Sequence, residues 1–240
     1  MAASQAVAVV KTELFLDAGG GTTATVDVSD LGIVTCTGTG GGCGGLIIPA
    51  FLAPHTELLV TGSIGQFVID ATGVGGVTAS VPTLQNLSQI EAASSGAGAL
   101  FTEFTDTDYC MGGGCFGSQF VLSASVVNDT GIAASTTTFA SFADASDAVP
   151  AGTLIGSFAN LTGLSDNASG TFANPIGTSG SLSTATSMIF TGKGDIQASF
   201  QISSSMGRSG EPTPEPASII LLGSFVGLAA LKVRRKTHRI

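Results

Sequence analysis

Apolar and polar residues alternate along several short stretches of this chain, as they do in β-strands that have one buried and one exposed face. Residues 195–202 show the pattern most clearly, and residues 22–28, 67–71 and 120–126 repeat it. Breaks rich in Gly, Ser and Asn separate these stretches, and before Pro212 no stretch keeps a 3.6-residue apolar period beyond about three turns. The body of the chain is therefore predicted to be all-β.

The strand expected at residues 195–202 follows a second apolar stretch, residues 187–190, across the turn Gly192, Lys193 and Gly194. A short connection with glycine in it typically joins two antiparallel neighbours of one sheet. The sequence therefore predicts a β-hairpin over residues 187–202.

One domain accounts for these strands. No Pro-rich or charged linker divides residues 1–202, and about 200 residues can bury a single core. We expect a single β-sandwich or jelly-roll-like domain, with most of the fourteen Phe residues in its core. Residues 203–213 contain few apolar side chains and are predicted to be a flexible linker.

The charges divide the chain into an acidic body and a basic end. Residues 1–231 hold three basic residues and all seventeen acids, a net charge of −14. Binding to nucleic acid or to an anionic membrane needs a basic face that displaces counterions, so we expect no nucleic-acid partner for the body. The five basic residues at the end are Lys232, Arg234, Arg235, Lys236 and Arg239.

An apolar run, residues 217–231, precedes the basic end, or 217–233 if Lys232 extends its charge out of the membrane. As a helix it would span roughly 22 to 25 Å, slightly less than the ~30 Å core of a bilayer. A buried core helix is the alternative on length alone. Prolines directly upstream and charges directly downstream favour a membrane helix, with the basic end on the cytoplasmic side.

The residues around this run resemble a known sorting signal. Pro214, Glu215 and Pro216 precede the apolar segment, and the Arg-rich cluster ends the chain. The combination is similar to the PEP-CTERM sorting signal of Gram-negative bacteria. The resemblance implies that residues 214–240 are recognised by exosortase, a membrane processing enzyme, with cleavage near Pro216. It also implies transient anchoring in the inner membrane, export to the cell surface or medium, and association with exopolysaccharide or biofilm matrix.

Export requires an N-terminal signal, and the first residues do not contain a convincing one. Residues 1–10 lack a basic start and a long apolar stretch before Lys11. Small residues at Ser4 and Ala6 suit a signal-peptidase cut. We therefore expect residues 1–6 to be the remnant of a signal peptide whose beginning lies upstream.

The four cysteines form two local pairs around glycine-rich loops. Three disulfide pairings are possible in principle, and short flexible loops favour Cys36 with Cys43 and Cys110 with Cys115. Such bridges would join loop tips rather than the core. A zinc site is the competing interpretation, but the spacing lacks the usual C-x-x-C pattern.

Acidic residues are the remaining candidates for chemistry. No serine has a Gly-x-Ser-x-Gly setting and the body has only one histidine, so a nucleophile and base are missing. Glu103, Asp106 and Asp108 lie close in sequence and are weighed as calcium ligands or glycosidase acids. The simpler interpretation is that they are solvated acids at the end of a strand.

These observations favour a non-enzymatic, exported surface or matrix protein without cofactor, with exosortase and matrix polysaccharide as partners. A lectin-like or calcium-dependent carbohydrate-binding module is the alternative. The absence of Trp and the single Tyr count against it, because such modules usually stack aromatic side chains on sugar rings. A hydrolase is disfavoured by the missing catalytic residues.

Overall fold

The computed structural model describes residues 10–29, 32–49, 57–74, 83–109, 116–132, 134–146, 148–177 and 180–205, which all belong to one compact unit. Two predictions lie outside these residues: the pairing of Cys110 with Cys115, and the signals at the two ends of the chain.

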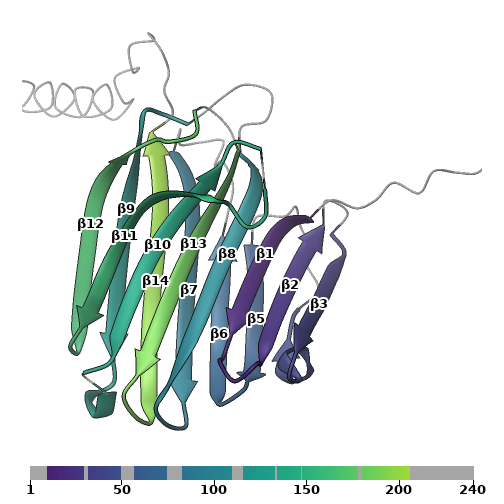
Figure 1. Cartoon of the computed structure of the whole chain (residues 1–240), viewed down its shortest axis with the longest axis vertical. Helices are drawn as coiled ribbons and strands as arrows, with labels where there is room; N and C mark the ends of the chain where they lie inside the picture. The colour runs from purple at the N-terminus through teal and green to yellow at the C-terminus, as the bar shows by residue number, and fades with distance from the viewer. Residues whose placement is uncertain are drawn as a thin grey trace, which may run out of the picture. The chain divides into compact units, whose positions relative to one another are not determined.

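The described residues form an all-β sandwich of two seven-stranded antiparallel sheets, which confirms the predicted fold class (Figure 1). Sheet A contains β1 (Val10–Asp17), β2 (Thr23–Ser29), β3 (Val34–Thr39), β8 (Gly98–Tyr109), β10 (Thr136–Asp144), β11 (Thr153–Thr162) and β13 (Gly180–Phe190). Sheet B contains β4 (Leu46–Ile47), β5 (Glu57–Ile64), β6 (Phe67–Val74), β7 (Thr83–Ser94), β9 (Gln119–Asn128), β12 (Ser165–Ala173) and β14 (Gly194–Ser205). Two short 3-10 helices, η1 (Gly42–Gly45) and η2 (Thr130–Ile132), lie in connections.

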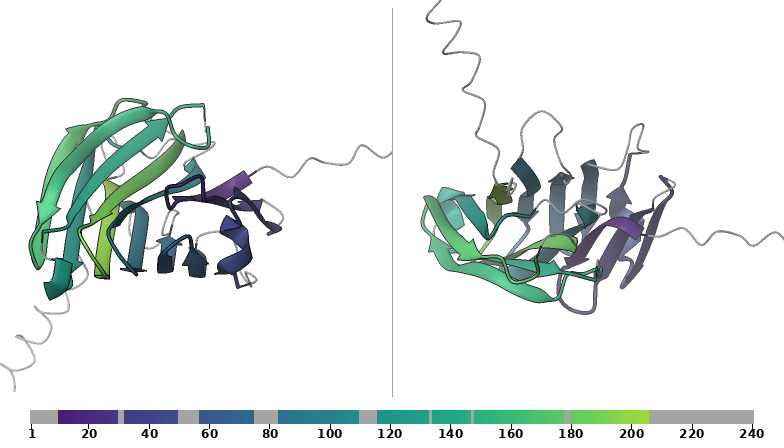
Figure 2. Two further views of the ribbon diagram at one scale, coloured as in Figure 1. Left: turned by 60° about the horizontal axis from the view of Figure 1, so that its bottom comes forward. Right: turned by 90° about the horizontal axis from the view of Figure 1, so that it is seen from above.

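The strand order is that of a jelly roll with an added flank. From β7 to β14 successive strands alternate between the sheets, except for β10 and β11, which pair within sheet A. These eight strands run β11-β10-β13-β8 in one layer and β12-β9-β14-β7 in the other, the arrangement of two Greek keys wrapped into a sandwich. The meanders β1-β2-β3 and β4-β5-β6 widen the two layers on one side (Figure 2).

The hairpin predicted over residues 187–202 is wrong. β13 pairs with β8 and β10 in sheet A, whereas β14 pairs with β7 and β9 in sheet B. The turn between them therefore crosses from one sheet to the other. Local sequence specifies that the chain reverses there, but the partner of each strand depends on distant segments such as β7 and β8.

Phenylalanine fills the space between the sheets, as the sequence suggested. The fully buried aromatic side chains are Phe67, Phe104, Phe120, Phe139, Phe190 and Phe200. Gly73 of β6 makes room for one of them, because a Cβ at this position would lie 2.1 Å from the ring of Phe104. The two sheets are therefore matched in shape across the core at this point.

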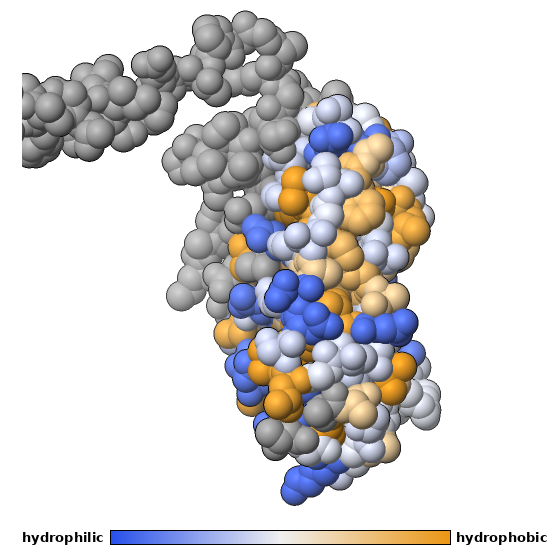
Figure 3. Space-filling model, turned by 90° about the vertical axis from the view of Figure 1, so that its left-hand side faces the viewer, coloured by the Kyte–Doolittle hydropathy of each residue, from blue (hydrophilic) through white to orange (hydrophobic). Residues whose placement is uncertain are grey.

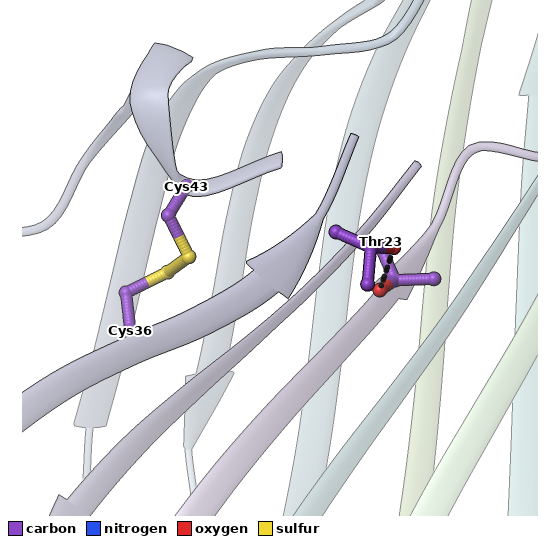
Figure 4. Close-up of a disulfide and its surroundings, with 4 residues drawn as sticks. Thr23, Cys36 and Cys43 are labelled. Carbon is purple, nitrogen blue, oxygen red and sulfur yellow. Dashed lines mark hydrogen bonds between the residues drawn. A yellow bond between two sulfur atoms is a disulfide. The ribbon is translucent and has the colours of Figure 1, made fainter. Parts of the chain in front are cut away.

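The Cys36–Cys43 disulfide is present and lies at the edge where the chain passes from sheet A to sheet B (Figure 4). Cys36 belongs to β3 and Cys43 to η1, and both side chains pack against the core. The expectation that this bridge joins only loop tips is therefore wrong. Closing this short loop constrains the unfolded chain, a stabilisation of about 2 kcal/mol.

The connection from β3 to β4, beside the disulfide, packs tightly against β2. A Cβ at Gly42 would lie 2.0 Å from the carbonyl oxygen of Thr23, so this position accommodates only glycine without a backbone shift. The hydroxyls of Thr23 and Thr39 lie 2.9 Å apart next to the crossover (Figure 4). Thr39 also donates a hydrogen bond to the carbonyl of Gly21. These contacts fix the start of the passage between the sheets.

The last strand extends beyond the predicted end of the domain. β14 continues to Ser205, so residues 203–205 of the predicted linker are paired with β7. The rest of the linker and the predicted sorting signal lie outside the described residues. In the part of the chain that the structure describes, none of the helices has the length and apolar character needed to cross a bilayer.

Some large apolar side chains are exposed near the edge formed by β11 and β12. Leu154 of β11 and Leu164 of the following turn are about half exposed. Figure 3 views the molecule from this side and shows apolar residues set among hydrophilic ones. Apolar residues scattered in this way are ordinary on a protein surface and do not mark a binding site.

Candidate functional site

A groove of about 430 Å³ lies on the outer face of sheet B. It crosses strands β6, β7, β14 and β9, and we call it the sheet B groove. Its volume falls in the range of small-molecule sites, roughly 300 to 1,000 Å³. The residues that line it are Asp70, Thr72, Gln89, Ile90, Glu91, Ser125, Val127, Gln197, Ala198 and Ser199.

Strand alternation explains why polar side chains gather in the groove. In β14 the even residues Ile196, Ala198 and Phe200 are buried in the core, so Gln197 and Ser199 point outward. The same alternation in β6 buries Ile69 and exposes Asp70. The pattern that predicted the strands thus also determines which side chains face the groove.

The strand register sets these outward side chains in two rows across the sheet. The first row runs Val127, Gln197, Glu91, Asp70. The second row runs Ser125, Ser199, Gln89, Thr72. Side chains directly opposite on adjacent strands have Cβ atoms ~5 Å apart, so each row is a continuous line of side chains. All of them are polar except Val127, which is apolar and half exposed.

The groove is acidic. Asp70 and Glu91 are direct cross-strand partners and are its only ionisable side chains. Lys193, a basic residue of the turn before β14, is not among the residues that line the groove. The carboxylates therefore lie beside amides and hydroxyls, without a cation in the lining.

This lining is suited to hydrogen bonding rather than to stacking. Glutamine, serine and threonine both donate and accept hydrogen bonds, and carboxylates accept them. No aromatic residue lines the groove, since the described phenylalanines of β6 and β14, Phe67 and Phe200, point into the core. The lining thus offers hydrogen-bond donors and acceptors rather than a flat aromatic surface.

A second set of acids lies on the outer face of sheet A. Glu13 of β1 is the direct partner of Asp27 of β2. Glu103 of β8, on the other side of β1, pairs with Phe15, two residues along from Glu13. We call these three acids the sheet A acid cluster. Each is partly buried, and Oδ1 of Asp27 has no hydrogen-bond partner among the described residues.

Burial raises the pKa of each carboxyl group in the sheet A acid cluster, and repulsion adds to the effect at Glu13. Burial, the charge of Asp27, a hydrogen bond with Asp27 and the charge of Glu103 raise the pKa of Glu13 to about 7. Burial also raises the pKa of Asp27 and, against a hydrogen bond with Ser183, the pKa of Glu103. Glu13 therefore keeps its proton up to about pH 7, well above the range in which an exposed glutamate loses it.

The connection between β10 and β11 covers the neighbouring part of sheet A (Figure 1). The backbone N–H of Ala151 donates to Oγ of Ser183 over 3.0 Å, and that Oγ lies 2.6 Å from Oγ1 of Thr105. Ser181 donates to the carbonyl of Ala148 in the same connection. Thr105, Ser181 and Ser183 are consequently fully buried although they lie on an outer face.

The structure separates two of the acids that the sequence grouped as calcium ligands. Glu103 lies on the outer face of sheet A, whereas Asp106 is buried between the sheets and accepts a hydrogen bond from Thr12 over 3.0 Å. These two side chains therefore do not share an ion. Interpreting Asp106 as a solvated acid was also wrong, and the side chain of Asp108 lies outside the described residues. In the described ranges no three His, Cys, Asp or Glu residues are grouped to hold a metal ion.

Sequence reasoning missed both sites. Asp70 and Glu91 are twenty-one positions apart, and Glu13, Asp27 and Glu103 are further dispersed. Each acid lies at a polar position of a strand in which apolar and polar residues alternate. This alternation is the one sequence signal that indicates an outer face for these acids. Their grouping depends on which strands pair and in which register.

Comparison with known proteins gives only weak similarities. No protein-family model and no curated protein matches the chain. Among solved structures, the K1 cleaved adhesin domain of Lys-gingipain from Porphyromonas gingivalis W83 aligns with 64% of this chain and 100% of its own, at 11% identity and a TM-score of 0.32.

Two xylan-binding modules give similar values. The CBM22-1 xylan-binding domain of Xyn10C from Paenibacillus barcinonensis aligns over 68% of this chain and 87% of its own, at 10% identity and a TM-score of 0.32. The xylan-binding module CBM15 covers 67% and 97%, at 13% identity and the same TM-score. At such scores no property of these proteins is transferred to this chain.

Proposed function

We propose that this chain is a non-enzymatic, exported surface or matrix protein whose sheet B groove binds a polysaccharide chain. The observation that carries the proposal is the groove itself, with its two rows of amides, hydroxyls and carboxylates on paired strands. Regular strands hold these groups at fixed spacing, so a ligand with hydroxyls along its length meets donors and acceptors already in place.

Hydrogen bonds make up most of this recognition. Gln89 and Gln197 each offer an amide that donates and accepts, and Ser125 and Ser199 each offer a hydroxyl. A single such contact contributes about 0.5 to 1.5 kcal/mol, so binding depends on several being made together. We therefore expect each groove to bind its polysaccharide with modest affinity. Many copies of the protein on one long polymer would together bind it more tightly.

Export and sorting complete the proposal. Pro214, Glu215 and Pro216, the apolar residues 217–231 and the basic end support processing by an exosortase at the inner membrane. The pairing of Cys36 with Cys43 agrees with a chain that folds in an oxidising compartment.

The groove is tested with the full-length chain in mild detergent, titrated with neutral and amino-substituted oligosaccharides of plant and bacterial type. We expect Gln197→Ala to weaken binding about fivefold, because one hydrogen-bonding amide is lost. Gln119→Ala is the matched control, since Gln119 is exposed on sheet B six residues along β9 from Ser125, ~20 Å away. Absence of binding to every oligosaccharide, equal effects of the two changes, or cleavage of a bound oligosaccharide would contradict the proposal.

The sorting signal is tested separately by the intact mass of the protein recovered from the cell surface and medium. Wild type is expected to lack the residues after about Pro216, whereas Glu215→Ala is expected to stay uncleaved in the membrane. Recovery of wild type with its basic end intact would show that no processing occurs at this motif.

A further inference from the structure

The sheet B groove carries a charge that its neighbours do not balance. Asp70 and Glu91 are opposite each other on β6 and β7, and their flanking partners in the row are Thr61 and Gln197, which are neutral. Cross-strand partners have Cβ atoms ~5 Å apart, and like charges at this separation repel. The groove therefore holds two acids on adjacent strands, and a bound cation would relieve the repulsion between their charges.

Nothing in the described body supplies that cation. Lys11 and Lys193 are its only basic residues, and Lys193 belongs to the turn before β14 rather than to the groove. The two acids are also fully accessible, since both side chains are exposed in the groove. A cation that balances the charges of Asp70 and Glu91 must therefore come from the ligand or from salt in solution.

A metal ion does not fit this position well. Hard divalent cations take six or more oxygen ligands in proteins, commonly with several carboxylates. Here only two acids are present, on neighbouring strands of a sheet, and no third acidic, His or Cys ligand joins them among the described residues. An ammonium group needs fewer partners, because its three N–H groups form charge-assisted hydrogen bonds with carboxylates and amides.

We infer that the sheet B groove selects polysaccharides whose sugars carry free amino groups, with Asp70 and Glu91 binding the ammonium group. The inference rests on the proposed function and specifies its ligand class. Gln89, Gln197 and Ser199 contact the hydroxyls of the same sugars. The acid pair also excludes polymers of uronic acids, whose carboxylates would lie against it. Without an aromatic platform, this charge pairing is the main source of selectivity.

The test compares matched oligosaccharides by calorimetry with the full-length chain in mild detergent, at low salt and mildly acidic pH. The probes are glucosamine oligomers with free amines, the same oligomers fully N-acetylated, and galacturonic acid oligomers. We expect the free-amine form to bind at least about tenfold more tightly than the acetylated form, and the uronic acid form not to bind. Added salt should reduce the preference.

Variants distinguish a built site from the general attraction of an acidic protein for a cationic polymer. Asp70→Asn with Glu91→Gln keeps the shape and the hydrogen-bonding capacity, and it should lose the preference for the amine while retaining the acetylated oligomer. Asp17→Asn with Asp144→Asn removes the same charge from sheet A, away from the groove, and should keep the preference. The single change Glu91→Gln should lower the preference partway, and circular dichroism checks the fold of each variant.

The outcomes distinguish a failure of the inferred amino-sugar selectivity from a failure of polysaccharide binding as a whole. Equal binding of the amine and acetyl forms by wild type would overturn the inference and leave the proposed function standing. If the Asp70→Asn, Glu91→Gln variant still prefers the free-amine oligomer, the preference comes from the overall charge of the protein. That result would overturn the inference as well. Failure of every neutral and amino oligosaccharide to bind would overturn both.

Discussion

On the outer face of sheet B, Asp70 and Glu91 lie in an open groove, whereas on the outer face of sheet A, Glu13, Asp27 and Glu103 are partly buried. Both faces bring acids together in the same way, by pairing a carboxylate on one strand with a carboxylate directly opposite.

The two pairs differ in how far they are buried. On sheet A the β10–β11 connection packs over Ser181 and Ser183, and the neighbouring acids respond to burial with raised pKa values. On sheet B the side chains of Asp70 and Glu91 are exposed. The comparison teaches that burial, and not the local sequence pattern, decides whether two acids on paired strands have raised pKa values or stay open to solvent.

The sharpest test of this comparison places one new carboxylate on each face. Ser183 is fully buried beneath the β10–β11 connection, and Ser199 lines the sheet B groove. We expect Ser183→Asp to lower the free energy of unfolding by about 3 kcal/mol, because a charge is buried without a cation. Ser199→Asp should cost less than about 0.5 kcal/mol. Urea denaturation measures both, and equal costs would show that the two faces are covered alike.

The second test uses the proton held by Glu13. Between the ordinary pKa of 4.5 and about 7, folded Glu13 keeps a proton that the unfolded chain releases. The associated stability is therefore complete below about pH 4.5 and is lost as the pH rises through about 7. After allowance for solvent screening, we expect the free energy of unfolding to fall by about 1 kcal/mol from pH 5 to pH 8.

Glu13→Gln removes the ionisable group at this position. The free energy of unfolding should then depend less on pH between pH 5 and pH 8, and the domain should be more stable than wild type at pH 8. Gln119→Ala, a change at a side chain of sheet B that does not ionise, is the control and should leave the pH dependence of wild type in place. Chemical denaturation at a series of pH values reads out both variants. A Glu13→Gln variant with the wild-type slope would assign the pH dependence to other groups.

The smallest expected effect concerns the start of the connection that covers sheet A. Asp144 accepts hydrogen bonds from the backbone N–H of Ser146 over 2.7 Å and from its hydroxyl, which lower the pKa of Asp144. This contribution is present above the ordinary pKa of 3.8 and is lost as the pH falls through the lower folded value, the opposite direction to Glu13.

Asp144→Ala should lower the free energy of unfolding at neutral pH by a few tenths of a kcal/mol, because the group is exposed to solvent and its bonds are local. Thermal unfolding at neutral pH and at pH 3 measures the loss, which should shrink at pH 3. A loss of more than about 2 kcal/mol would mean that the whole covering of sheet A depends on this turn.

The sequence by itself determined the elements that depend on neighbouring residues. Alternation along 22–28, 67–71, 120–126 and 195–202 predicted strands, and the structure has β2, β6, β9 and β14 at these places. It also predicted a sandwich and the local pairing of Cys36 with Cys43, because a short glycine-rich loop closes at little entropic cost. Periodicity and loop closure are properties of a few adjacent residues.

Only the tertiary structure decided which strands are neighbours. The turn at 191–193 connects two sheets rather than two strands of one sheet, since β13 and β14 each find partners far away in sequence. The same pairing brings Asp70 beside Glu91 and Glu13 beside Asp27. Strand register, and the covering of an outer face by another segment, depend on contacts between segments that are distant in sequence. No local pattern of residues specifies them.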